Sequence, residues 1–385
     1  MNAIARSWMA EAVLADVPET ARLYLRPTAF IDAPHGHDGQ ALRLAGGLLW
    51  FSAVELIVVD GGQRIRQQLV PVEQLQTILQ TLPASLCTRA EAVLGHITGQ
   101  RAPLHLGERM LRFDQPHIMG ILNITPDSFS DGGRNADAAT AADAALAMMA
   151  NGASIIDIGG ESTRPGADTV WEGDEIARVM PIIHGLRGSD AIMSMDTRKA
   201  AVMRAALDGG AHIVNDVSAL TYDEAAMPLV ARAGCPVVLM HHKGDPQTMQ
   251  RDPHYNDVLI EVYDWLEARI EAAVAAGIPR EKIIVDPGIG FGKKLRHNLD
   301  LLNGLSLFHG LGCAILLGAS RKRMIGALSG EAPVDQRLGG SIALVLAGLA
   351  QGVQIVRVHD VAESVQAMRV WRGLRDAALT PAILF

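Results

Sequence analysis

Cysteine and aromatic residues are scarce in this sequence of 385 residues. The three cysteines, Cys87, Cys235 and Cys313, are far apart and have neither the spacing of a metal-binding pair nor that of a CxxC motif. Cys235 and Cys313 lie beside or within apolar runs, so we expect buried thiols in a reducing compartment. A basic excess is also missing. The net charge of −8 argues against a general nucleic-acid binder, although local basic clusters can still bind a small anion.

Long hydrophobic segments are absent as well. The N-terminal stretch carries Glu11 and Asp16 inside its apolar part, which makes it a poor signal peptide. The most apolar late run, SIALVLAGLAQGV, is shorter than the about 20 residues that span a bilayer. We therefore expect a cytoplasmic protein without a membrane partner.

Residues 116–385 alternate between short apolar runs and amphipathic, alanine-rich stretches. Near-continuous apolar strands are typical of a parallel sheet that is buried on both faces. Eight such units occupy 385 − 115 = 270 residues, and a closed (β/α)8 barrel takes about 250 residues. An open, doubly wound sheet is the alternative, but no G-x-G-x-x-G motif follows the first run, and eight even units favour closure. The runs are HIMGILNI, SIIDIGG, AIMSMD, HIVNDV, PVVLMH, KIIVDP, AILLGAS and VQIVRVH.

Residues 1–115 break this rhythm. GGLLWFSAVELIVVDGG indicates a strand pair or a bent strand, and VEQLQTILQTL and TRAEAVLGHITG indicate short helices. The fold class is therefore α/β, a (β/α)8 TIM barrel over 116–385 with a small N-terminal α+β appendage over 1–115. No paired carboxylates, metal-ligand spacing or phosphate loop occur in the appendage, so its role is not readable from its residues.

Each apolar run ends in polar or charged residues. The first passes through Asn123 into ITPDSFSDGG, a stretch whose turn-forming residues also suit an ordinary surface loop. A single Asp after a strand is often only the N-cap of the next helix. All eight ends, however, fall at the C-terminal mouth, where barrel enzymes build their active sites. We therefore expect the first loop to form one wall of a site.

Basic residues concentrate after the seventh and eighth runs. They are Arg321, Lys322, Arg323, Arg357 and His359, and barrels frequently bind phosphate at the loops after these two strands. Guanidinium, ammonium and imidazole groups suit an anionic substrate. Arg323 fits a solvated surface charge better than a ligand contact.

Asp196, Asn215 and Asp286 end the third, fourth and sixth runs. Two carboxylates and an amide suit a flat heterocycle with an amino-pyrimidinone edge, because carboxylates accept its N–H groups and Asn both donates and accepts. The two carboxylates also fit a general acid/base pair. A metal cluster is a third interpretation, provided that their oxygens converge.

Seven motifs follow one another along the chain: NITPDSFSDGG, GGESTRPGA, DTRKA, IVNDVSAL, DPGIGFGK, GASRKRMIG and RVHDV. In this order and spacing they resemble the motifs of the dihydropteroate synthase family of folate biosynthesis, over about residues 115–375. The resemblance implies a transferase that condenses 6-hydroxymethyl-7,8-dihydropterin pyrophosphate with para-aminobenzoate, in the presence of Mg²⁺, to give 7,8-dihydropteroate and pyrophosphate. It also implies a target of sulfonamides and a homodimer, and the alanine-rich late helices suit subunit pairing.

The resemblance assigns roles to individual residues. Asn123 matches the residue that coordinates Mg²⁺ with the pyrophosphate, and Met240 lies in a strand that lines the pterin pocket. Thr163 and Arg164 match contacts of the second loop, and Phe291 and Ser320 lie in the region that receives the aminobenzoate. The matched pterin-binding residues are Asp196, Asn215, Asp286 and Lys322, and the anion-binding pair is Arg357 and His359. The expected catalytic residues are Asp196, Lys322, Arg357 and His359.

The implied reaction needs no general base, because an arylamine is neutral at pH 7 and already nucleophilic. The barrier lies in losing pyrophosphate, whose leaving oxygens Mg²⁺, Arg357 and His359 would stabilise. Asp196 would stabilise positive charge that develops at the exocyclic methylene. The first and second loops are expected to close over the pyrophosphate and exclude water.

One residue departs from the family pattern, and two other functions stay open. His242 stands in LMHHKG where the family commonly has methionine, which bears on the shape of the pocket near the fifth strand. A related methyltetrahydrofolate:corrinoid methyltransferase needs a pterin pocket but neither the basic RVH pair nor the SRK signature. A non-catalytic pterin-binding barrel is the other alternative, and the competent residues at every polar position argue against it.

Overall fold

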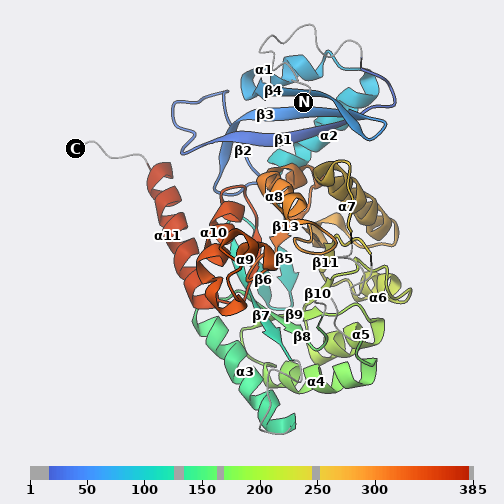
Figure 1. Cartoon of the computed structure of the whole chain (residues 1–385), viewed down its shortest axis with the longest axis vertical. Coiled ribbons are helices and arrows are strands. Elements are labelled where there is room, and N and C mark those ends of the chain that lie inside the picture. The colour runs from blue at the N-terminus through green and yellow to red at the C-terminus, as the bar shows by residue number, and fades with distance from the viewer. Residues whose placement is uncertain (1–16, 125–133, 163–168, 245–251, 381–385) are drawn as a thin grey trace, which may run out of the picture.

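The computed structural model describes residues 17–124, 134–162, 169–244 and 252–380. Eight parallel strands, β7 to β14, pair in sequence order, and β14 pairs with β7 to close a barrel. Helices surround it (Figure 1). The predicted (β/α)8 barrel is thereby confirmed. The strands are β7 His117–Asn123, β8 Ile155–Gly159, β9 Ile192–Asp196, β10 Ile213–Asp216, β11 Val237–Met240, β12 Ile283–Asp286, β13 Ala314–Leu317 and β14 Ile355–Val358.

The helices of the barrel follow the strands in regular alternation. A 3-10 segment, η3 Leu305–Leu311, lies between α8 and β13, and both α9 and α10 lie between β13 and β14. The helices are α3 Arg134–Ala150, α4 Glu172–Gly185, α5 Ala200–Gly209, α6 Ala226–Ala233, α7 Val258–Ala275, α8 Leu295–Asn303, α9 Arg323–Leu328, α10 Leu338–Leu349 and α11 Val361–Leu379.

The strands are apolar on both faces because each face packs against a different layer. Side chains such as Ile155, Ile213 and Ile355 point inward and form one cluster inside the barrel. Their neighbours, such as Ile156 and Val214, pack outward in clusters that include residues of the surrounding helices. Burial on both sides removes the polar alternation that a half-exposed strand would show.

The N-terminal region is an antiparallel sheet with two helices, as the sequence predicts. β3 pairs with β1 on one side and with β2 and β4 on the other. The helices α1 and α2 pack on the sheet (Figure 1), while Tyr24, Ile57 and Val59 join the largest cluster of the barrel. The elements are β1 Arg22–Ile31, β2 Leu42–Arg43, β3 Trp50–Asp60, β4 Gln63–Pro71, α1 Val72–Leu79 and α2 Ala84–Thr98.

A short hairpin closes the bottom of the barrel. β5 Leu104–Leu106 and β6 Arg109–Leu111 pair around Gly107, whose φ of 65° suits a tight turn. Leu104, Leu106, Leu111 and Phe113 belong to the same cluster as the side chains inside the barrel. The hairpin therefore fills the end of the barrel opposite to the mouth.

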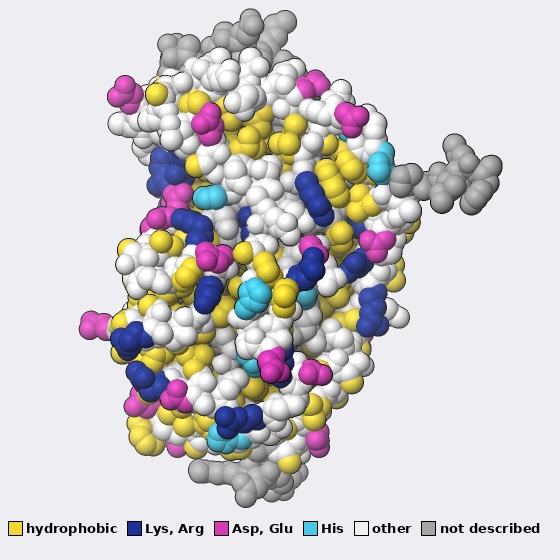
Figure 2. All heavy atoms as spheres, turned by 180° about the vertical axis from the view of Figure 1, so that it is seen from behind, with side chains coloured by type: hydrophobic (Ala, Val, Ile, Leu, Met, Phe, Trp, Pro, Cys, Tyr) yellow, Lys and Arg dark blue, Asp and Glu magenta, His cyan; other side chains and the backbone are white. Residues whose placement is uncertain are grey.

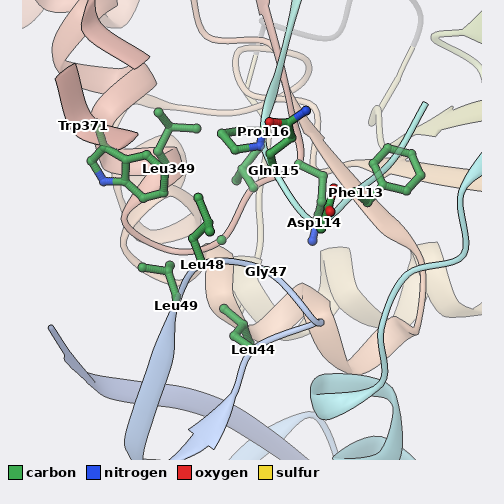
Figure 3. A pocket seen from close by; sticks show the side chains of 13 residues that line it. Leu44, Gly47, Leu48, Leu49, Phe113, Asp114, Gln115, Pro116, Leu349 and Trp371 are labelled. Carbon is green, nitrogen blue, oxygen red and sulfur yellow. The ribbon is translucent and has the colours of Figure 1, made fainter. Parts of the chain in front are cut away.

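The contact between the appendage and the barrel encloses two cavities. Figure 3 shows Leu48 and Leu49, which precede β3, near Pro116, Leu349 of α10 and Trp371 of α11. The cavity between them has a volume of about 30 Å³, which is room for about two water molecules. A larger cavity of about 180 Å³ lies beside Arg101 and Cys313.

Arg101 joins the two parts through backbone carbonyls. Its side chain is buried, and Nε donates to the carbonyl of Cys313 at 3.0 Å and Nη2 to that of His309 at 3.0 Å. On the side of the appendage, Nη1 donates to the carbonyls of His96 and Gly99 at 2.7 and 3.0 Å. Burial lowers the pKa of Arg101 to about 10, which still leaves the guanidinium charged at neutral pH.

The distribution of charged side chains on the surface and the length and polarity of the helices are relevant to the partners of the protein. The face shown in Figure 2 carries Lys, Arg, Asp and Glu side chains interspersed with one another rather than a single basic patch. Within the part of the chain that the structure describes, no helix has the length and the apolar character needed to cross a membrane.

Arg101→Met should destabilise the whole fold, because four carbonyls would lose the donor that Arg101 supplies, and of these the carbonyl of His309 keeps the N–H of Gly312, while the methionine still fills the space. We expect a loss of about 3 kcal/mol or more in the free energy of unfolding. Urea unfolding measures it, with Arg204→Met on the exposed face of α5 as the control. Equal stabilities of the two variants would contradict a joining role for Arg101.

Candidate active site

The predicted polar residues gather at the C-terminal mouth of the barrel. Parallel strands in a closed barrel end on the same rim, so the last residues of neighbouring strands are brought together. The register places Asn123 beside Gly159, Gly159 beside Asp196, and Asp196 beside Asn215. Met240 and Asp286 are register partners at the ends of β11 and β12.

Arg357 is the centre of a buried charge network. Its Nε donates to Asp157 Oδ2 at 2.6 Å, and its Nη2 donates to Asp196 Oδ2 at 2.7 Å. The Nδ2 atom of Asn215 donates to the same Asp157 oxygen at 3.0 Å. Asp157 thus orients two predicted ligand-binding residues at once. It is fully buried in the middle of β8.

Two carboxylate oxygens at this centre have no partner among the residues that the structure describes. Asp157 Oδ1 and Asp196 Oδ1 are both buried and, among the described residues, neither accepts a hydrogen bond. A buried acceptor without a donor costs free energy. The pair therefore offers acceptor positions to a bound molecule that supplies N–H or O–H groups.

Burial and charge shift the pKa values of these groups. Burial raises the pKa of Asp196 to about 7, Arg357 opposes the shift, and Asp157 adds to it. For Arg357, burial lowers the pKa, but Asp157 and Asp196 together raise it above the ordinary value. Arg357 therefore stays charged, while Asp196 changes its protonation near neutral pH.

A second cluster forms where β12 meets the glycine-rich loop. Asp286 Oδ1 accepts from the backbone N–H of Gly288 at 2.7 Å. Lys322 donates to the carbonyl of Ile289, and its Nζ lies 4.4 Å from the centroid of the Phe291 ring. Burial lowers the pKa of Lys322 to about 8, while Asp286 opposes the shift. The structure therefore brings Phe291 together with Asp286 and Lys322.

Ser320 and His359 also meet. The Ser320 hydroxyl accepts from the backbone N–H of His359 at 3.2 Å and lies 3.1 Å from His359 Nδ1. Arg321 is paired with the Asp360 carboxylate through Nε and Nη2, which commits its charge to that partner. Arg323 is exposed at the start of α9, as the interpretation of a solvated charge requires.

Asn123 and Asp196 lie on either side of Gly159. A Cβ atom at Gly159 would lie 3.2 Å from Asn123 Oδ1 and 3.7 Å from Asp196 Oδ2. The glycine therefore leaves space between two side-chain oxygens at the rim. Among the described residues, no three His, Cys, Asp or Glu side chains lie close enough together to hold a metal ion by themselves. Thr163 and Arg164 lie outside the described residues, as does the first loop beyond Ile124.

Two features of the site were not predicted. Asp157 sits within the run SIIDIGG, where a single acidic residue among buried aliphatic ones was the available signal. The other is a cluster beside β8: Lys199 Nζ donates to Glu161 at 2.9 Å and to Glu175 at 2.6 Å. Glu161 also accepts from the backbone N–H of Val170 at 3.0 Å, which connects the chain on the two sides of residues 163–168.

His242, the departure from the family pattern, packs against a helix. Its ring lies edge-on to Trp265 of α7, with the centroids 6.0 Å apart. The neighbouring His241 contacts the same indole ring at 4.9 Å. One side of the His242 ring is therefore packed against Trp265 of α7.

Comparison with known proteins agrees with this geometry. The model of the pterin binding enzyme family matches residues 119–359. Dihydropteroate synthase of Escherichia coli K12 is 46% identical over 261 residues, which are 68% of this chain and 92% of that protein. The enzyme of Neisseria meningitidis serogroup B is 48% identical over 274 residues, 70% of this chain and 96% of that protein.

Solved structures extend the likeness to three dimensions. Dihydropteroate synthase of Yersinia pestis, in a sulfonamide drug complex, is 44% identical with a TM-score of 0.68 over 71% of this chain and 100% of that one. The Xanthomonas albilineans enzyme with 4-aminobenzoic acid is 44% identical with a TM-score of 0.67, over 71% of this chain and 98% of that one. The structure of the same enzyme with 7,8-dihydropteroate is 41% identical with a TM-score of 0.65, over 71% of this chain and 99% of that one. The resemblance seen in the motifs is confirmed, and this chain belongs to the dihydropteroate synthase family of pterin binding enzymes.

Proposed function

We propose that this chain condenses 6-hydroxymethyl-7,8-dihydropterin pyrophosphate with para-aminobenzoate to form 7,8-dihydropteroate and pyrophosphate. The observation that carries the proposal is the mouth of the barrel, where Arg357 is held between Asp157 and Asp196 next to Asn215. The family relationship supports the same reaction, since a related enzyme was crystallised with the aminobenzoate and with the product.

The pterin would bind among Asp196, Asn215, Asp286 and Lys322. Asp196 Oδ1 is a buried acceptor without a donor in the described part of the chain, and the amino-pyrimidinone edge of a pterin supplies N–H groups of the kind that it requires. The buried side chain of Met240, at the end of β11, would form part of the apolar wall of this pocket.

Chemistry at the anion end would rest on electrostatics. Arg357 would stabilise charge that grows on the pyrophosphate as the bond to the methylene breaks, and the His359 ring, beside Ser320, would donate to the same group. Asp196, once ionised, would stabilise the positive charge that develops on the pterin side. The neutral arylamine would then attack without a base.

The rim also suits Mg²⁺, which would neutralise charge on the pyrophosphate when bound. The fit rests on the donor set, because Asn123 offers a side-chain carbonyl oxygen beside the carboxylate of Asp196, and hard divalent cations prefer oxygen ligands. We assign Asn123 as the protein ligand, with the remaining ligands coming from the substrate and water.

The aminobenzoate would lie next to the Phe291 ring and Ser320, with Thr163 and Arg164 contributing from the second loop. Sulfonamides would compete there, as the complex of the Yersinia pestis enzyme suggests. A cytoplasmic location agrees with the three free cysteines.

A homodimer would use the surface of α9, α10 and α11. Five exposed apolar side chains lie on these helices and the segment between them, and an apolar surface of this kind favours a second copy of the chain. Sedimentation velocity should then give the mass of two chains. The residues are Leu328, Val334, Leu338, Val370 and Leu374.

The purified protein should release pyrophosphate and form dihydropteroate only when both substrates and Mg²⁺ are present. A coupled steady-state assay that follows both products measures this. Methyl transfer from methyltetrahydrofolate to a corrinoid would instead favour the related methyltransferase. Pterin binding without turnover of either kind would favour a non-catalytic barrel.

Pterin affinity should fall at acidic pH, because the ionised Asp196 accepts from the ring and its pKa is about 7. Calorimetry with a pterin that lacks the pyrophosphate should show a loss of about tenfold for each pH unit below 7. Asp157→Asn should move this limb to lower pH, because the negative charge of Asp157 contributes to the raised pKa of Asp196. Asp208→Asn, an exposed carboxylate of α5, is the control and should leave the limb in place. An unmoved limb in Asp157→Asn would remove Asp157 from the network.

Arg357→Lys should slow the chemical step by about 10²–10³-fold, since an ammonium group cannot contact Asp157 and Asp196 while also facing the pyrophosphate. Single-turnover kinetics measures the step, and calorimetry measures pterin affinity. The rate should fall by more than the affinity for a pterin without pyrophosphate. Arg323→Lys is the matched control on α9. Losses of equal size in rate and affinity would place Arg357 in the pterin pocket alone.

A further inference from the structure

Lys293 is a buried lysine whose acceptors, among the described residues, belong to one loop and the strand beside it. It is 3% exposed. Its Nζ donates to the carbonyls of Gly288 and Phe291 at 2.8 and 3.0 Å and lies 2.8 Å from His241 Nδ1. The carbonyl of His241 is at 3.4 Å. The three ammonium protons are therefore used within the loop of residues 288–292, which we call the glycine loop, and the end of β11.

The imidazole contact fixes the form of His241. A protonated Lys293 only donates, so His241 Nδ1 then accepts and the ring proton lies on Nε2. Burial lowers the pKa of Lys293 well below its usual value, and the charge of Asp286 opposes the shift. Burial lowers the pKa of His241 well below its usual value, and the charge of Lys293 lowers it further. The neutral ring, 3% exposed and edge-on to Trp265, is held in place by packing.

The glycine loop lies against the end of β11 without space for side chains. A Cβ at Gly288, where φ is 67°, would lie 1.8 Å from the carbonyl oxygen of His241, and one at Gly292, where φ is 63°, would lie 2.3 Å from that of Lys243. The Tyr255 hydroxyl donates to the carbonyl of Gly292 at 2.9 Å. These contacts fix the backbone of the glycine loop, and Lys293 contributes the hydrogen bonds to the carbonyls of Gly288 and Phe291.

The same backbone carries groups that face the substrates. The carbonyl of Phe291, bonded to Lys293, belongs to the residue whose ring lies beneath Lys322. The carbonyl of Ile289 accepts from Lys322, and the N–H of Gly288 donates to Asp286. A shift of the glycine loop would therefore move Phe291 directly and would also change the surroundings of Lys322 and Asp286. Asp196 and Asn215 lie on β9 and β10, two or more strands away from β12, which precedes the loop.

We propose that Lys293, oriented by His241, is a positioning residue that fixes the glycine loop and so sets the aminobenzoate half of the site. The proposal rests on the proposed function for the identity of the second substrate. Lys293 touches neither substrate, and its effect passes through Phe291 and Lys322.

Lys293→Met tests this, because methionine fills the slot but donates no hydrogen bond. We expect the KM for para-aminobenzoate to rise about tenfold or more, and the affinity for a pterin without pyrophosphate to fall by a smaller factor, since the loop also contacts Asp286 and Lys322 of the pterin pocket. Lys294→Met is the matched control, since the neighbouring Lys294 is half exposed and pairs with Asp252 at the surface. Its KM should equal that of the wild type. A wild-type KM in folded Lys293→Met overturns the proposal.

Variants of His241 keep the test decisive if Lys293→Met does not fold. Asparagine places an acceptor oxygen near the position of Nδ1, whereas leucine removes the acceptor. We expect His241→Asn to keep the aminobenzoate KM within about threefold of wild type and His241→Leu to raise it about tenfold. Equal KM values in these two variants overturn the proposal. Turnover by the wild type is measured first, so a failure of the proposed function is seen separately as a lack of product.

Discussion

The site depends on how one guanidinium group balances two carboxylates inside the mouth of the barrel. Charges taken out of water must be paired, and here Arg357 pairs with Asp157 and Asp196, while each acid has one oxygen that accepts from none of the described residues. The pairing holds Arg357 in its orientation, and the second acid raises the pKa of Asp196 toward neutrality. A barrel that closes β14 onto β7 is what brings residues 157, 196 and 357 to one point, because they lie on three different strands.

Carbonyl oxygens carry much of the remaining organisation. Arg101, at the bottom of the barrel, and Lys293, at its mouth, are both buried basic side chains that donate mainly to backbone carbonyls. Because their partners belong to the backbone, these hydrogen bonds form only when the chain follows one path. Each of the two side chains therefore specifies a backbone geometry, which apolar packing alone would leave less tightly defined.

The sequence predicted the barrel, its eight strands and most of the described rim residues, because strands buried on both faces leave long apolar runs and polar residues at their ends. Asp157 was not predicted, because the prediction used the polar residues that follow an apolar run and this acid lies within one. The Lys293–His241 contact escaped for another reason: the two residues are 52 positions apart, and only the register of β11 against β12 brings them together. The hairpin at the bottom of the barrel also lay inside the stretch assigned to the appendage, since its two strands have three residues each and too short a pattern to interpret.

The cage around Arg101 has a consequence for the order in which the protein folds. During synthesis the N-terminal sheet and α2 are complete long before the chain reaches Cys313, 212 residues after Arg101. Until then the arginine has only the carbonyls of its own neighbourhood, and the lower surface of the appendage, with Tyr24, Ile57 and Val59, has no barrel to cover it. Contacts of such sequence separation form late and slowly. Until the last quarter of the barrel has been synthesised, the appendage therefore keeps an apolar face exposed to solvent.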